Sequence, residues 1–121
     1  MLIKDIKNCK EIIAGDNTIL KEILHPLKDN LKTGYSLAQA IVKPGEITLL
    51  HRLRASEVYF ILQGKGLMYV DDEIKEVESG QAIYIPPNST QRIKNLGDQD
   101  LIFLCVVEPA WLKEAEEILE K

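Results

Sequence analysis

The chain has 121 residues, enough for one domain with a buried core. A content of 45% hydrophobic and 28% charged residues is typical of a soluble globular protein and excludes a disordered or fibrous one. The formal net charge of −4 argues against nucleic acid or an anionic membrane surface as a partner, since both require a basic face. Because no apolar run approaches the roughly 20 residues of a membrane span, no insertion into a membrane is expected.

The N-terminus and the cysteines indicate the compartment. Residues 1–11 contain lysines but no continuous apolar stretch of the kind found in a secretory signal. Cys9 and Cys105 are too few for a disulfide framework, and Cys105 lies in the apolar run 101–107, which predicts a small buried side chain. We therefore expect a cytoplasmic protein with reduced thiols.

Short segments rich in β-branched and aromatic residues alternate with turn signals along most of the chain. A strand segment at about 17–27 precedes a barrel core at about 35–108, and Asp71-Asp72 predicts a tight hairpin within that core. Many short strands with Gly and Pro turns predict an all-β sandwich or barrel in a single domain. The predicted core strands are 35–42, 47–53, 58–62, 67–70, 74–77, 82–85, 91–95 and 101–107.

The C-terminal segment has a different period. From Trp111 to Leu119, apolar residues recur every three or four positions, and Pro109 fits a helix start. This spacing predicts a short α-helix at about 110–120. The face with Trp111 is expected to pack on the barrel.

His51 is the first candidate for a functional residue. In a strand over 47–54, Leu49, His51 and Leu53 share one face, and Arg52 and Arg54 lie on the other. Two arginines favour solvent, so His51 is expected to point inward, where an imidazole needs a hydrogen-bond partner or a metal.

Glu57 begins the next strand, and its direction has two interpretations. If Glu57 points inward, Tyr59 does too, and the apolar residues Val58, Phe60 and Leu62 form an outer face that another surface must cover. In the alternative, these three side chains form the core and Glu57 faces solvent. Periodicity alone slightly favours the alternative.

Two longer patterns resemble the cupin family. The cupin family has two sequence motifs, and the segments 45–64 and 80–95 match the residue spacings of the first and the second motif in full. The first is Gly45, five residues, His51, one residue, Leu53, three residues, Glu57, six residues, Gly64. The second is Gly80, five residues, Pro86, one residue, Asn88, two residues, Gln91, three residues, Asn95. The resemblance implies a cupin double-stranded β-helix, or jelly-roll barrel, and favours the inward direction of Glu57.

The resemblance also implies a site. Typical cupins bind a divalent transition metal through three histidines and the glutamate of these two motifs. His51 and Glu57 retain their places here, whereas Leu53 and Gln91 replace the other two histidines. Leucine cannot bind a metal, and the carbonyl oxygen of Gln91 is a weaker ligand than imidazole.

Three interpretations of the site remain open at this point. His51, Glu57 and Gln91 could bind manganese, iron, nickel or zinc. Without metal, a His51–Glu57 pair completed by Gln91 could bind a small organic molecule, with His51, Glu57 and Tyr59 as catalytic candidates. The three residues could also be a polar cluster of purely structural role.

Function and assembly follow as expectations. The chain is either a metal-dependent enzyme on a small carboxylate, diketone or sugar-like substrate, or a non-catalytic, metal-free binding or regulatory protein. The resemblance includes sugar-phosphate isomerase-like (RmlC-like) proteins and dioxygenases, but the missing ligands argue against transferring either activity. A homodimer is expected, because small cupins often dimerise and an inward Glu57 leaves an apolar outer face.

Overall fold

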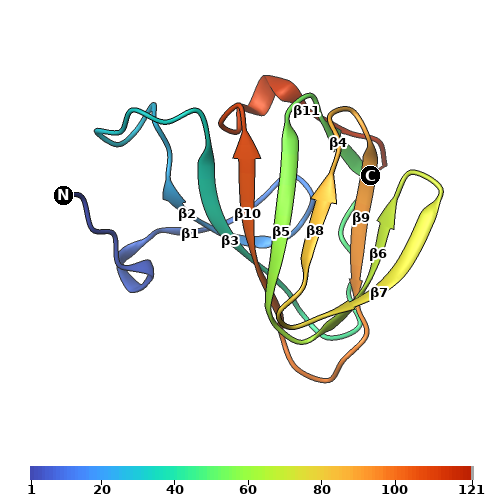
Figure 1. Cartoon of the computed structure of the whole chain (residues 1–121). Coiled ribbons are helices and arrows are strands. Elements are labelled where there is room, and N and C mark those ends of the chain that lie inside the picture. Colours follow the sequence, from blue (N-terminus) through green and yellow to red (C-terminus); the bar gives the residue numbers. More distant parts are fainter. Residues whose placement is uncertain (121) are drawn as a thin grey trace.

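The structure, a computed structural model, describes residues 1–120, and its regular secondary structure is almost entirely β-strand (Figure 1). One 3-10 turn, η1 (Ile6–Asn8), precedes the strands, and a second, η2 (Lys113–Ala115), follows β10. The strands are β1 (Glu11–Ile13), β2 (Ile19–Leu24), β3 (Ser36–Val42), β4 (His51–Leu53), β5 (Ser56–Gln63), β6 (Lys65–Val70), β7 (Glu73–Glu78), β8 (Ala82–Ile85), β9 (Thr90–Asn95), β10 (Leu101–Glu108) and β11 (Glu116–Ile118).

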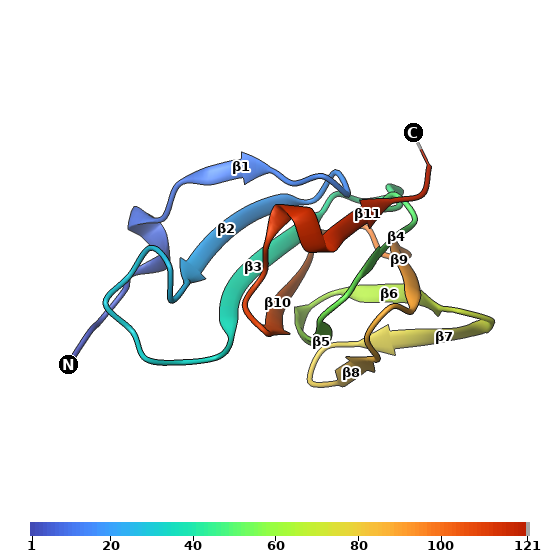
Figure 2. The same ribbon diagram turned by 90° about the horizontal axis from the view of Figure 1, so that it is seen from above.

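The strands form two antiparallel sheets that face each other across the core. One has the order β1-β2-β3-β10-β5-β8 and the other β11-β4-β9-β6-β7. Figure 2 shows β3, β10 and β5 in one layer and β4, β9 and β6 in the other. The predicted all-β sandwich of short strands is confirmed. So is the hairpin, in which Asp71 and Asp72 join β6 to β7 directly after the Val70–Glu73 pair.

Alternation of buried and exposed residues along the strands places the core between the sheets. On β10 every second residue from Leu101 to Val107 is buried, including Cys105 as predicted. The rings of Tyr59 and Phe103 lie 4.4 Å apart at 34°, joining two neighbouring strands within the core.

The direction of β5 decides between the two interpretations of Glu57. Glu57, Tyr59 and Ile61 are buried, whereas Phe60 and Leu62 are 39% and 43% exposed. The inward interpretation is therefore correct, although it leaves apolar side chains outside. At the second motif, Asn88 has a φ of 67°, so it adopts the conformation that glycine would supply there.

The prediction of a C-terminal helix is wrong. Residues 113–115 form a 3-10 turn, and Glu116–Ile118 pair with β4 as strand β11. The edge of β4 offers unpaired backbone groups, and a short isolated helix is marginal in water, so sheet pairing prevails over helical periodicity. The packing of Trp111 on the barrel is confirmed, against Leu53, Ala55 and Val107. Among the described residues, no helix is long and apolar enough to cross a membrane.

Two isoleucines of the five-stranded sheet test this arrangement. Ile93 on β9 is fully buried, whereas Ile74 on β7 is 57% exposed. We expect Ile93→Ala to lower the free energy of unfolding by about 2–5 kcal/mol, because it removes buried contacts and leaves a cavity. Ile74→Ala should cost less than about 1 kcal/mol. Equal losses in urea denaturation would contradict the described register.

Candidate functional site

A chain of two hydrogen bonds connects the two sheets at one end of the core. The Tyr59 hydroxyl on β5 donates to Oε1 of Gln91 on β9 over 2.8 Å. Gln91 in turn donates from Nε2 to Oε1 of Glu57 over 3.0 Å. The carbonyl oxygen and the NH₂ group of Gln91 therefore both bond to side chains of β5. We call Tyr59, Gln91 and Glu57 the interior network.

The interior network is buried. Gln91 is fully buried, and Tyr59 and Glu57 are 3% and 6% exposed. A buried polar group without a partner is costly, so the paired amide, hydroxyl and carboxyl hold each other in place. The inward direction of Glu57 and Tyr59, which the resemblance to the cupin motifs favoured over the periodicity alone, is observed. The role of Tyr59 as a donor to Gln91 depends on a contact between sheets that strand parity does not contain.

Burial changes the acid chemistry of the interior network. It raises the pKa of Glu57 from 4.5 to about 8, although the Gln91 hydrogen bond opposes the shift; the nearby carboxylates Asp16 and Glu116 add to it. Burial also raises the pKa of Tyr59. At neutral pH the network is thus uncharged, with Glu57 protonated and able to donate a hydrogen bond or a proton.

His51 lies next to the interior network but is not bonded to it. The Nδ1 atom of the buried His51 donates to the Leu49 carbonyl over 2.8 Å, since a carbonyl oxygen can only accept. Its Nε2 faces Asp16 Oδ2 at 3.6 Å. His51 pairs in register with Gln91, yet the partner of its free nitrogen is Asp16, so the predicted direct His51–Glu57 pair is not formed.

The chain termini supply two acids that sequence reasoning missed. Asp16 is buried in a turn before β2, where Thr18 donates to its Oδ1 from the backbone (3.1 Å) and from the hydroxyl (2.8 Å). Glu116 lies on β11. Burial raises the pKa of its carboxyl, and the interaction with His51 opposes part of that rise. The position of a Cβ at Gly15 would lie 2.9 Å from Glu116 Oε1, which shows how closely the N-terminal turn approaches the Glu116 carboxyl on β11. Neither acid belongs to a cupin motif.

The metal set of a typical cupin does not fit these residues. Leu53, at the place of one histidine, is 3% exposed and packed among Ala55, Val107 and Trp111. Gln91, at the place of another, already uses its carbonyl oxygen to accept from Tyr59. Across residues 1–120, no group of three His, Cys, Asp or Glu side chains is arranged to hold a metal ion. The predicted ligands Glu57 and Gln91 are brought together and are bonded to each other, whereas His51 lies beside them with Leu49 and Asp16 as its partners.

Comparison with known families agrees with the two motifs. A family model described as a cupin domain matches residues 38–107, more than half of the chain. This chain belongs to the cupin family. The solved structure of a Cupin 2 conserved barrel domain protein from Salinispora arenicola superposes with a TM-score of 0.76, covering 95% of this chain and 92% of that one at 17% identity. The predicted cupin barrel is thereby confirmed.

Two cupin relatives show how function varies. An uncharacterised protein of Methanocaldococcus jannaschii is 46% identical over 114 residues, covering 92% of this chain and 89% of that protein. A glucose-6-phosphate isomerase of Pyrococcus furiosus is 27% identical over 116 residues, covering 84% of this chain but only 61% of the isomerase. Enzymes therefore occur among the relatives, and none of these likenesses assigns an activity to this cupin.

The raised pKa of Glu57 predicts a pH-dependent stability. The folded value of about 8 exceeds the ordinary value of 4.5, so the protonated form is favoured by folding. This contribution is complete below pH 4.5 and is lost as the pH rises through 8. Glu57→Gln cannot ionise and keeps an acceptor for Gln91, so between pH 5 and 9 it should gain stability over the wild type by on the order of 3–5 kcal/mol.

Urea denaturation at a series of pH values measures this difference. Glu76→Gln, at an exposed position on β7, is the matched control and should run parallel to the wild type. A constant difference between wild type and Glu57→Gln from pH 5 to 9 would mean that Glu57 ionises normally in the folded protein.

Proposed function

We propose that this cupin binds a small organic molecule in the barrel through the interior network, with no divalent metal at the place where typical cupins hold one. The observation that supports this proposal is that the Gln91 amide accepts a hydrogen bond from Tyr59 and donates one to Glu57. Ligand binding replaces one of these two hydrogen bonds by a bond to the ligand. A neutral Glu57 and a neutral Tyr59 then offer two donors, and Gln91 offers one donor and one acceptor.

The chemistry of this network favours a neutral polar group on the ligand, such as a carbonyl, hydroxyl or amide. Such a group satisfies the donors of Tyr59 and Glu57 without placing a further anion beside Asp16 and Glu116. An anionic phosphate or carboxylate would meet those two acids at short range. Binding is the function proposed; a proton transfer by Glu57 would be added only if the ligand has an acidic or basic atom at that carboxyl.

Metal analysis tests the metal-free part of the proposal. Protein purified without chelators should contain far less than one manganese, iron, nickel or zinc per chain, and adding these ions should leave the melting temperature unchanged. Gln91→His, which restores one motif ligand beside His51 and Glu57, should gain metal-dependent stabilisation. Stoichiometric metal in the wild type that is lost in both His51→Ala and Glu57→Gln would overturn the proposal.

The side-chain amide of Gln91 reports on ligand binding directly. We expect at least one of the probes acetamide, 2-butanone and 1,2-propanediol to shift its ¹H–¹⁵N resonances in a saturable manner, because each can replace a network partner. Tyr59→Phe should weaken that binding about tenfold, the loss expected for one hydrogen bond in a dry site. Resonances that none of the three probes moves would contradict the proposed contact with Gln91.

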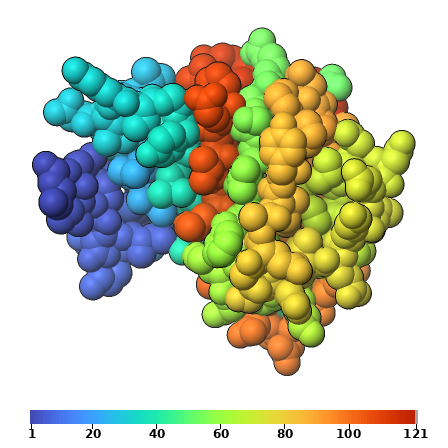
Figure 3. Space-filling model, viewed as in Figure 1, coloured from blue at the N-terminus to red at the C-terminus, as the bar shows by residue number. Residues whose placement is uncertain are grey.

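We also propose that the chain forms a homodimer through the outer sheet face, which we define as the outward side chains of β3, β10 and β5. Figure 3 shows these strands side by side across one face, with β10 in red-orange beside β5 in green. Phe60, Leu62 and Val106 are 36–43% exposed there. A contiguous apolar patch of this kind on a sheet typically marks an interface.

A single charge should break this interface. Phe60→Lys is expected to convert a dimer to a monomer in light scattering after size exclusion, because burying an unpaired ammonium is costly. Ile74→Lys, on β7 and away from the outer sheet face, is the control and should remain dimeric. A wild type that is monomeric at 100 μM would contradict the proposed dimer.

A further inference from the structure

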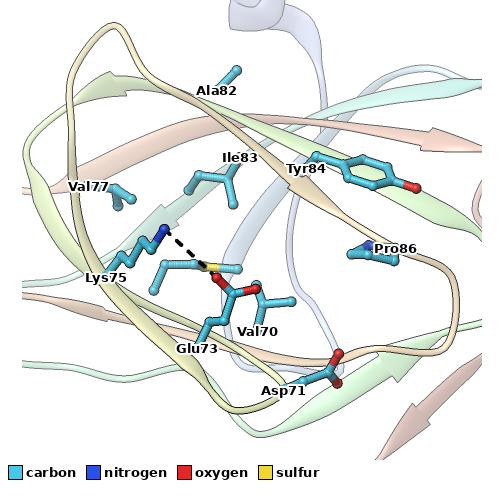
Figure 4. A pocket seen from close by; sticks show the side chains of 10 residues that line it. Val70, Asp71, Glu73, Lys75, Val77, Ala82, Ile83, Tyr84 and Pro86 are labelled. Atoms are coloured by element: carbon cyan, nitrogen blue, oxygen red, sulfur yellow. Dashed lines mark ion pairs between the residues drawn. The ribbon is translucent and has the colours of Figure 1, made fainter.

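A groove lies where the free edges of the two sheets meet. β7 ends the five-stranded sheet and β8 ends the six-stranded one, and within residues 1–120 no strand pairs with either on its far side. The groove between them has a volume of about 380 Å³, within the range of about 300–1,000 Å³ seen for small-molecule sites. Figure 4 shows that its lining comes from the β6–β7 hairpin on one side and from β8 on the other.

The floor of the groove is apolar. Met68, Val70, Val77 and Ile83 line it, and the last three pack against the barrel core. Water in contact with such a floor is readily displaced by an apolar group. The groove therefore fits the hydrocarbon or aromatic body of a ligand.

The strand register connects this floor to the interior network. Val70 pairs with Gln91, and Ile83 pairs with Tyr59. Directly paired residues in antiparallel sheets project from the same face with neighbouring Cβ atoms. Val70 and Ile83 therefore separate the groove from Gln91 and Tyr59 by one side chain, and a ligand in the groove lies beside the network.

The polar groups of the groove fall into two sets, with the Glu73–Lys75 ion pair along its length and Asp71 with Tyr84 at one end. Figure 4 shows the Asp71 carboxylate, the Tyr84 hydroxyl and Pro86 at the end opposite Val77 and Ala82. The backbone N–H of Thr90 donates to Asp71 Oδ1 over 2.9 Å, which fixes the carboxylate and lowers its pKa, so it is ionised at neutral pH.

The charge of the groove is negative. Its charged side chains are Asp71, Glu73 and Lys75, and the Lys75 ammonium lies 3.8 Å from the Glu73 carboxylate. That pairing leaves Asp71 as the uncompensated charge. A cationic group on a ligand complements it, whereas an anionic group would be repelled.

We propose that this groove binds an organic amine with an apolar body, with the body on Met68, Val70, Val77 and Ile83 and the ammonium group facing Asp71 and the Tyr84 ring. The inference rests on the proposed function and names the class of its ligand and the place where the ligand body lies. Aromatic and aliphatic amines both satisfy it. The neutral polar group that the interior network favours would then be a second substituent of the same molecule.

Three probes with the same phenylethyl body and different charge test the proposal: 2-phenylethylamine, 2-phenylethanol and 3-phenylpropionate. Titrations followed by the methyl resonances of Val70, Val77 and Ile83 should give the amine an affinity about tenfold above that of the alcohol, with the carboxylate weakest. Asp71→Asn should remove the preference for the amine, and asparagine accepts the φ of 50° found at this position. Asp72→Asn, in the same turn but outside the groove lining, should retain it.

The outcomes separate this inference from the proposed function. Equal affinities for amine and alcohol, or a preference that survives Asp71→Asn, would overturn the amine-binding groove. Probes that shift the Gln91 side-chain amide but none of the three groove methyls would overturn the groove and leave the interior network as the site. Absence of binding by all three probes would also overturn the groove, whereas the metal analysis and the neutral probes would still decide the proposed function.

Discussion

The Gln91 amide is the interaction on which the rest of the site depends. It joins β9 of one sheet to β5 of the other by accepting from Tyr59 and donating to Glu57. Because Gln91 is fully buried, neither hydrogen bond competes with bulk water. The two bonds satisfy the polar groups of Glu57 and Tyr59 on the inner side of β5, and the alternation along that strand leaves the apolar side chains of Phe60 and Leu62 outside. The site and the outer sheet face therefore follow from the same alternation along β5.

Leu53 and Gln91, which replace two of the motif histidines, act together. Leu53 fills its place with apolar contacts to Val107 and Trp111, and Gln91 turns a ligand position into a hydrogen-bond bridge. His51 is left with a backbone carbonyl on one nitrogen and Asp16 on the other. Asp16 and Glu116 come from the N-terminal turn and from β11, which meet at Gly15, so the terminal segments complete the polar end of the barrel. In this cupin His51 and the motif glutamate Glu57 are retained, and the second and third imidazoles are replaced by Leu53 and Gln91.

Much of the fold could be predicted from the sequence because strand parity and turn residues are local properties. They placed His51 inside, whereas the inward direction of Glu57 was predicted from the resemblance to the cupin motifs, against a slight preference of the periodicity alone. Contacts between distant segments could not be predicted in this way. The period of Trp111–Leu119 is helical, but the free edge of β4 selects a strand, and only the folded barrel contains that edge. Asp16 lies 35 residues before His51 and outside both motifs, so no spacing rule connects the two. The groove depends on where the edges of β7 and β8 meet, which requires the complete sheet order.

A neutral Glu57, held by Gln91 in the buried interior, is what makes the interior network uncharged. A pH titration of the Glu57 side-chain carboxyl tests this state most directly, followed by its ¹³C chemical shift in the folded protein and assigned by comparison with Glu57→Gln. We predict a midpoint at about pH 8, far above the ordinary value of 4.5. A carboxyl that titrates near pH 4.5 would show that Glu57 is solvated or paired with a cation, and would contradict the uncharged interior network.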